Sequence, residues 1–213
     1  MKTVESKVVV ERTASYSILL PENKIKRVIF VIHGYAQLAK DFIREFDFLD
    51  DGETLLVAPE GLSRFYSRDK IGASWMTRIN RDDEIGDYIR YLDRLESSLT
   101  ERHDLSSADR KILGFSQGVH TAVRWFTESL HNHSQLILCS SDFPADADFV
   151  KLNLRLNGNE LIYIQGKEDT IVGIDTFRQS SSLLASKGIT YREILFEGKH
   201  VISKEAVSAA MKK

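Results

Sequence analysis

The hydrophobic residues of this chain form short continuous runs, and these alternate with segments that repeat at helical spacing. The runs are rich in β-branched residues, which is typical of strands buried on both faces of a parallel sheet. They lie at 28–32, 54–57, 111–113, 136–139, 161–165 and 191–196, with helical stripes at 42–49, 85–95, 119–130 and 177–185 and a last helix from about 202. This alternation predicts an α/β fold, a mostly parallel, doubly wound sheet with helices on both faces, in one domain over residues 1–213.

Two regions fit this pattern less clearly. Residues 8–11 and 15–20 are expected to be short strands that begin the fold in antiparallel fashion. Residues 61–81 show no period but carry Phe65, Tyr66, Trp75 and Met76, which predicts a long irregular loop of functional importance.

Composition narrows the class of protein. The 213 residues are 42% hydrophobic and 28% charged, with a net charge of −2, which gives no reason to expect nucleic acid or an anionic membrane as a partner. The sequence lacks a signal peptide and an apolar run long enough to insert into a membrane, and its lone cysteine, Cys139, fits the reducing cytoplasm. We therefore expect a cytoplasmic protein, and the sequence does not decide between a monomer and a homodimer.

The most informative stretch is Gly-Phe-Ser-Gln-Gly at 114–118, which lies between an apolar run and a helical stripe. Gly-x-Ser-x-Gly in this context predicts a nucleophile elbow, a strained strand-to-helix turn that exposes one serine, here Ser116. The two glycines are needed because side chains there would collide with the turn. The N–H groups at the start of the following helix would face the negative charge of a reaction intermediate.

Two further side chains follow predicted strands in the order that this chemistry requires. Asp169 and His200 each lie in a glycine-containing turn directly after a strand, and the order Ser…Asp…His is that of the α/β-hydrolases. His200 would accept the proton of Ser116, and Asp169 would orient the imidazole. Asp142, which follows the preceding strand, is the alternative acid.

The intermediate also needs backbone N–H donors. The N–H of Gln117 follows the nucleophile directly, and the turn after residues 28–32 should supply a second donor. Because Gly34 permits a tight turn there, we assign the second donor to Tyr35, with His33 bonding the loop backbone. No metal is expected, because His131 and His133 are two residues apart and do not share a helix face.

These residues together resemble the phospholipase/carboxylesterase family, which includes the acyl-protein thioesterases, over about residues 27–213. The resemblance implies an α/β-hydrolase fold without a large lid and hydrolysis of esters or thioesters, with Ser116, Asp169 and His200 as the triad. It also implies that residues 74–76 line an acyl pocket, so we expect Gly34, Trp75 and Met76 to contact the substrate.

The chain departs from the family at several positions. Tyr35-Ala36-Gln37 stands where the family has a second glycine and an aspartate, Val119 replaces a glycine after the elbow, and Gly173 replaces a proline. These changes leave the catalytic residues intact, but because of them we do not assign the family's acyl-protein or lysophospholipid substrates to this chain.

The sequence therefore predicts a cofactor-free serine hydrolase that cleaves small acyl esters or thioesters. A binding module that kept the fold without turnover, and an acyltransferase with the same triad, are the two alternatives.

Overall fold

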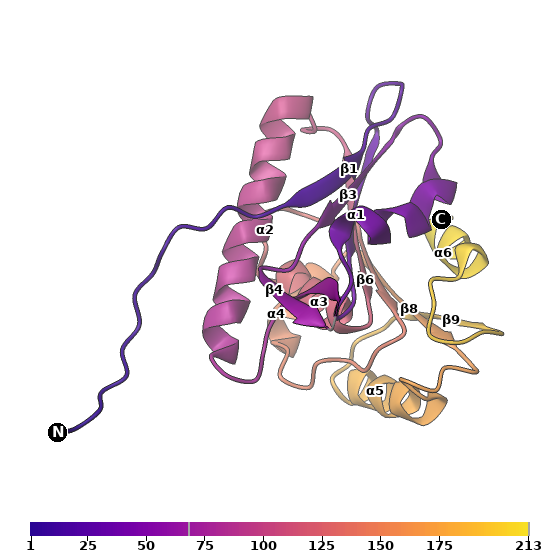
Figure 1. Cartoon of the computed structure of the whole chain (residues 1–213). Helices are drawn as coiled ribbons and strands as arrows, with labels where there is room; N and C mark the ends of the chain where they lie inside the picture. The colour runs from indigo at the N-terminus through magenta and orange to yellow at the C-terminus, as the bar shows by residue number, and fades with distance from the viewer. Residues whose placement is uncertain (68, 213) are drawn as a thin grey trace.

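A seven-stranded mixed sheet forms the centre of the protein, in a computed structural model that describes residues 1–67 and 69–212 (Figure 1). The strand order is β1-β3-β2-β6-β7-β8-β9, and every pairing is parallel except that of β1 with β3. The strands are β1 (Tyr16–Leu19), β2 (Arg27–Ile32), β3 (Thr54–Pro59), β6 (Asp109–Phe115), β7 (Gln135–Cys139), β8 (Glu160–Gly166) and β9 (Arg192–Phe196). The predicted α/β architecture is thus confirmed.

Helices cover both faces of this sheet, and each face has its own hydrophobic core. One core includes residues of α2 (Arg81–His103), α3 (Gln117–Glu128), α4 (Phe149–Arg155) and α5 (Ile174–Ser186). The other includes residues of α1 (Ala39–Phe42), the 3₁₀ helix η1 (Ile43–Leu49) and α6 (Lys204–Met211). The expected helices are present, and the seven-residue α4, which no sequence period announces, is an addition.

The parallel register brings separate turns to one edge of the sheet. Ile32, the last residue of β2, pairs with Gly114 of β6, so the turn after β2 lies beside the turn after β6. Gly166 at the end of β8 pairs with Phe196 at the end of β9. The carboxyl ends of neighbouring parallel strands therefore present their turns together, which is where open α/β sheets bind ligands.

The start of the chain differs from its prediction. Residues 15–20 form β1 as expected, but residues 8–11 form no strand and belong to an extended arm that leaves the body beyond α2 (Figure 1). Val8, Val9 and Val10 are 84%, 88% and 73% exposed. The expected strand is absent: Lys7 is ion-paired with Asp83 at the start of α2, and among the described residues the arm pairs with no strand, including β1.

The region 61–81 is also more regular than expected. It contains an antiparallel hairpin of β4 (Ser63–Ser67) and β5 (Lys70–Ser74), which forms a separate two-stranded sheet. Such a short hairpin, with glycine in β5, has too little alternation to be recognised from sequence. Among the described residues, none of the helices combines the length and the apolar character needed to cross a membrane.

Candidate active site

Ser116 occupies a sharp turn between β6 and α3, as the Gly-x-Ser-x-Gly motif predicts. Its backbone has φ 51° and ψ −125°, a strained conformation for a residue with a side chain. A Cβ atom on Gly114 would lie 2.6 Å from the Gly118 carbonyl oxygen, and one on Gly118 would lie 2.2 Å from that of Ile32. Both glycines are therefore required by close backbone contacts, which is the physical reason for the motif.

His200 and Asp169, which the sequence assigns to the turns after β9 and β8, form a hydrogen-bonded pair. The distance from His200 Nδ1 to Asp169 Oδ2 is 2.7 Å, and the Asp169 side chain is fully buried. The other carboxylate oxygen, Oδ1, accepts the backbone N–H groups of Ile171 and Val172 at 2.8 and 2.9 Å. Because a carboxylate can only accept here, His200 carries its proton on Nδ1 and leaves Nε2 as the basic nitrogen.

The imidazole of His200 is held close to the elbow. Its ring lies 4.9 Å, centroid to centroid, from the ring of Phe115, the residue that precedes Ser116. In the described part of the chain, His200 Nε2 makes no hydrogen bond to Ser116. Catalytic hydrogen bonds are often long without substrate, so this arrangement is compatible with a base that engages on binding.

Asp142, the alternative acid, is bonded to a different histidine. Its Oδ1 lies 3.0 Å from Nε2 of His120, a residue of α3 that follows Ser116 by one helical turn. The hydrogen bond from His120 holds the pKa of the Asp142 carboxyl below its usual range. His200 thus has Asp169, and not Asp142, as its carboxylate partner.

The turn after β2 is fixed by His33. Its Nε2 accepts the Gly61 N–H at 3.0 Å, so its Nδ1 carries the proton and donates to the Gly34 carbonyl at 2.7 Å. Burial lowers the pKa of His33, which keeps the ring neutral. His33 therefore has the structural role expected from the sequence.

This turn reaches the nucleophile through Gly34. A Cβ atom on Gly34 would lie 3.1 Å from Ser116 Cβ, so the two residues are in direct contact. The Gly34 N–H donates to Gln37 Oε1 at 2.7 Å and is already engaged. Within the described residues, the backbone N–H groups of Tyr35 and Gln117 donate to no protein acceptor, which leaves both available to an oxyanion.

The hairpin supports the turn from outside. Ala36 donates its N–H to Ala73 O at 2.9 Å, and Ala73 donates to Gln37 O at 3.3 Å. Ala36 has φ 64°, a left-handed backbone conformation that favours glycine. The ring of Tyr35, a residue that is 61% exposed, stacks on Phe65 of β4 at 5.0 Å.

The side chain of Gln117 has a second role that sequence reasoning missed. Its Nε2 donates to Ser74 Oγ at 3.0 Å and to Met76 O at 3.4 Å, and its Oε1 accepts the Trp75 N–H at 3.3 Å. The residue after the nucleophile therefore ties the 74–76 segment to the elbow. A polar residue at 117 together with Ser74 was the only signal for this contact.

Trp75 and Met76 differ in their access to solvent. Trp75 is 1% exposed, its Nε1 donates to His33 O at 2.9 Å, and its ring lies 5.0 Å from that of His33. Met76 is partly exposed, and its sulfur lies 3.8 Å from Arg124 Nη1. Trp75 thus supports the turn after β2 from the core, and contact of Trp75, Met76 or Gly34 with substrate stays a prediction.

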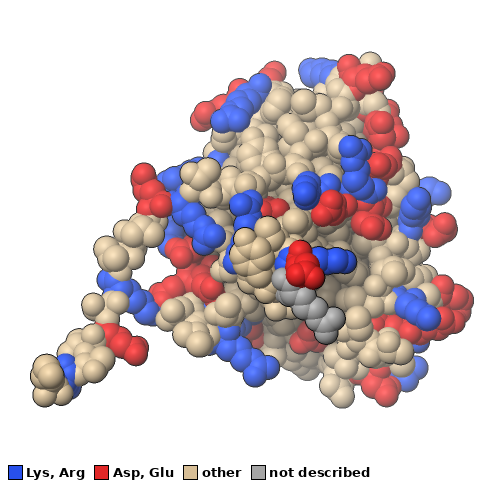
Figure 2. Space-filling model, viewed as in Figure 1, with Lys and Arg blue, Asp and Glu red and all other residues tan. Residues whose placement is uncertain are grey.

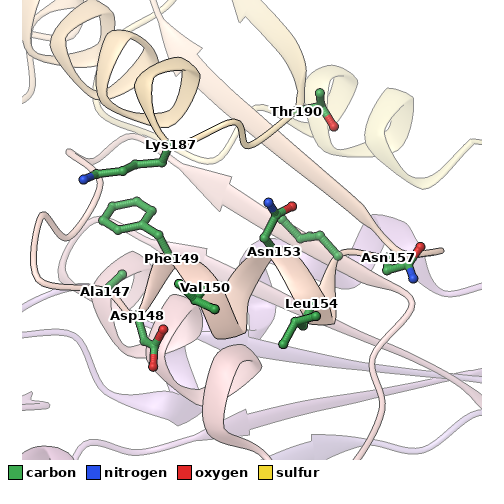
Figure 3. A pocket seen from close by; sticks show the side chains of 10 residues that line it. Ala147, Asp148, Phe149, Val150, Asn153, Leu154, Asn157, Lys187 and Thr190 are labelled. Carbon is green, nitrogen blue, oxygen red and sulfur yellow. The ribbon is translucent and has the colours of Figure 1, made fainter.

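A groove of about 840 Å³ lies beside α4 and contains none of the predicted site residues (Figure 3). Phe149 lines it beneath Lys187, whose Nζ is 5.5 Å from the ring centroid. Its lining residues include no serine, cysteine or histidine, so the groove has no counterpart of the Ser116 and His200 arrangement.

Several solved structures share this fold. Esterase PE8 aligns with a TM-score of 0.74 and 22% identity over 93% of this chain and 96% of its own. Acyl-protein thioesterase 2 of Zea mays aligns at 0.72 and 16% over 93% and 96%, and a carboxylesterase of Mesorhizobium loti at 0.71 and 17% over 92% and 92%. No protein-family model and no curated protein matches the chain in sequence.

These alignments span nearly the whole of each chain, so this protein has the α/β-hydrolase fold that esterases and acyl-protein thioesterases share. The fold expected from the resemblance to the phospholipase/carboxylesterase family is confirmed. Sequence identities this low show that the fold is shared, and they do not show that the activity is shared.

Proposed function

We propose that this chain is a serine hydrolase that cleaves small acyl esters or thioesters through an acyl-enzyme intermediate, without a cofactor. The observation that carries the proposal is the buried Asp169–His200 pair beside the strained turn of Ser116. A strained serine next to an oriented histidine is costly to maintain, and nucleophilic catalysis is the chemistry that uses both.

In the first half of the reaction, Ser116 Oγ attacks the acyl carbon while His200 Nε2 takes its proton. The carbonyl oxygen becomes an oxyanion, which accepts hydrogen bonds from the N–H groups of Tyr35 and Gln117. His200 then returns the proton to the departing alcohol or thiol, and the acyl group stays on Ser116. Asp169 stabilises the imidazolium that forms in between and does not itself become protonated.

In the second half, water takes the place of the leaving group. His200 removes a proton from the water as it attacks the acyl-enzyme, and the same two N–H groups stabilise the second oxyanion. The carboxylic acid leaves and Ser116 recovers its proton. If an alcohol or amine replaced water, the same residues would transfer the acyl group.

The surroundings favour a small acyl group. The ring of Tyr35, in the turn after β2, stacks on Phe65 of the hairpin of β4 and β5. Apart from this hairpin, the described residues form only the central sheet and its helices, with no further subdomain to act as a large lid. We therefore place acetyl to hexanoyl esters ahead of lipids.

The proposal is tested by hydrolysis of p-nitrophenyl esters from acetate to decanoate and of an acetyl thioester, with Ser116→Ala as the matched control. We expect turnover that is greatest for short chains and absent in Ser116→Ala. Added alcohol that diverts the acyl group from water would indicate the transferase. No turnover by a folded sample would contradict the proposal and favour a binding module.

A further inference from the structure

The arm at residues 1–14 contains a sequence that favours a strand but forms none in this structure. Val8, Val9 and Val10 are consecutive β-branched residues, which favour a strand, and yet they project into solvent. Figure 2 shows the outer end of the arm projecting from the body, with basic and acidic side chains interspersed among uncharged ones. An exposed apolar strand with free N–H and C=O groups is a template for pairing with another chain.

The arm is complementary to itself. In an antiparallel pair of two arms centred on Val9, Val9 faces Val9 of the second copy and Val8 faces Val10. The same register places Lys7 opposite Glu11 twice, once on each side of the two-fold axis. Opposite charges directly across a strand pair stabilise it. Val8 and Val10 of both copies form a four-residue cluster on one face of the ribbon, and the two Val9 side chains lie on the other face between the charged pairs.

The body of the protein offers a place for the partner's arm. A groove of about 610 Å³ lies between arm residues 9–14 and the body, where the partly buried Leu62 and Tyr91 contribute apolar surface. In the register above, residues 4–8 of the second copy lie opposite residues 10–14, along this groove. Helix α2 contributes two acidic residues and two arginines to the wall of the groove, so its charges there balance: they are Glu84, Asp87, Arg90 and Arg94.

We propose that two copies of this chain associate through their arms, as a two-fold antiparallel ribbon centred on Val9. A second copy fits better than β1 of the same chain, because residues 8–11 do not pair with β1 and Lys7 is ion-paired with Asp83 at the start of α2. That ion pair is exposed on both sides, so exchanging it for Glu11 of the second copy has little cost. The ribbon alone would be marginal, and packing along the groove supports it.

Charge reversal tests the register. Lys7→Glu and Glu11→Lys each replace two opposite-charge pairs with two like-charge pairs and should weaken the dimer about tenfold or more, measured by sedimentation velocity. The double variant Lys7→Glu/Glu11→Lys restores both pairs and should return the dimer to within about threefold of the original. Lys24→Glu, an equal charge change in the turn between β1 and β2, is the control and should have no effect.

The double variant separates pairing between arms from the Lys7–Asp83 contact. If Lys7 acted only through Asp83, Glu11→Lys would have no effect and the double variant would not recover. A monomer at every concentration, or a dimer that ignores both single reversals, would overturn the proposal.

A crosslink gives an independent test. Opposing Cα atoms lie about 4.5–5.5 Å apart in an antiparallel pair, within the range of a disulfide, so Val9→Cys should form a crosslinked dimer on mild oxidation. In the same register, the Thr13 residues of the two copies lie eight positions apart along the ribbon, or about 27 Å, so Thr13→Cys should not form a crosslink. The native Cys139 is buried and does not interfere. Equal crosslinking of both variants would refute the register.

Discussion

Replacing Asp169 with asparagine should reverse the tautomer of His200 while leaving the fold intact. In the native side chain, Oδ1 accepts two backbone N–H groups and Oδ2 accepts His200 Nδ1–H. Asparagine has one acceptor and one donor end, and the two backbone donors require the acceptor end. The amide NH₂ would then face His200 Nδ1, which must become an acceptor and carry its proton on Nε2.

A histidine protonated on Nε2 cannot accept the proton of Ser116. Loss of the base with geometry preserved is expected to lower kcat/KM by about 10³–10⁴-fold, or about 4–5.5 kcal/mol of transition-state stabilisation. Binding of substrate uses other groups, so KM should change far less than kcat.

The assay is hydrolysis of a short p-nitrophenyl ester by Asp169→Asn, beside Asp142→Asn as the matched variant. Asp142 is bonded to His120, so its replacement should leave kcat/KM within a few-fold of the original. Circular dichroism and a thermal melt establish that both variants are folded. The reasoning is refuted if Asp169→Asn keeps more than a tenth of the activity, or if Asp142→Asn loses as much.

Three further predictions concern stability. Ala36→Gly should raise the free energy of unfolding by up to about 1 kcal/mol in urea titrations, because glycine relieves φ 64°; a decrease would contradict this. Gly118→Ala should lower it by about 1–3 kcal/mol or more and abolish activity, since its Cβ would lie 2.2 Å from a carbonyl oxygen; an unchanged melt would show otherwise. Because burial lowers the pKa of His33, the unfolded chain binds this proton more readily. Stability should therefore decline below about pH 6.5, by at most about 1.4 kcal/mol per pH unit, and His33→Gln should flatten that decline.

The parts of the site that could be predicted from sequence are those that follow buried strands. Continuous apolar runs locate the strands, and parallel strands have their carboxyl ends at one edge of the sheet. The sequence alone therefore predicts that Ser116, Asp169 and His200 lie close together. The choice between Asp169 and Asp142 could not be made this way, because both follow a strand. Only the register of β8 with β9 and the hydrogen bonds decide which carboxylate meets His200.

Contacts between side chains far apart in sequence were not predictable. The bonds from Gln117 to Ser74 and Met76 depend on how the hairpin returns to the elbow, for which 61–81 has no periodic signal. Residues 8–11 illustrate the opposite error. Their strand propensity is real, but in the described residues the arm pairs with no strand, and the edge of β1 that faces away from β3 stays unpaired.

The most direct test of the central claim is covalent labelling by a fluorophosphonate, with the labelled peptide identified by mass spectrometry. We expect one adduct, on Ser116, which disappears in Ser116→Ala and falls sharply in His200→Ala. A folded sample that takes up no label, or takes it up equally without His200, would contradict the assignment of Ser116 as an activated nucleophile.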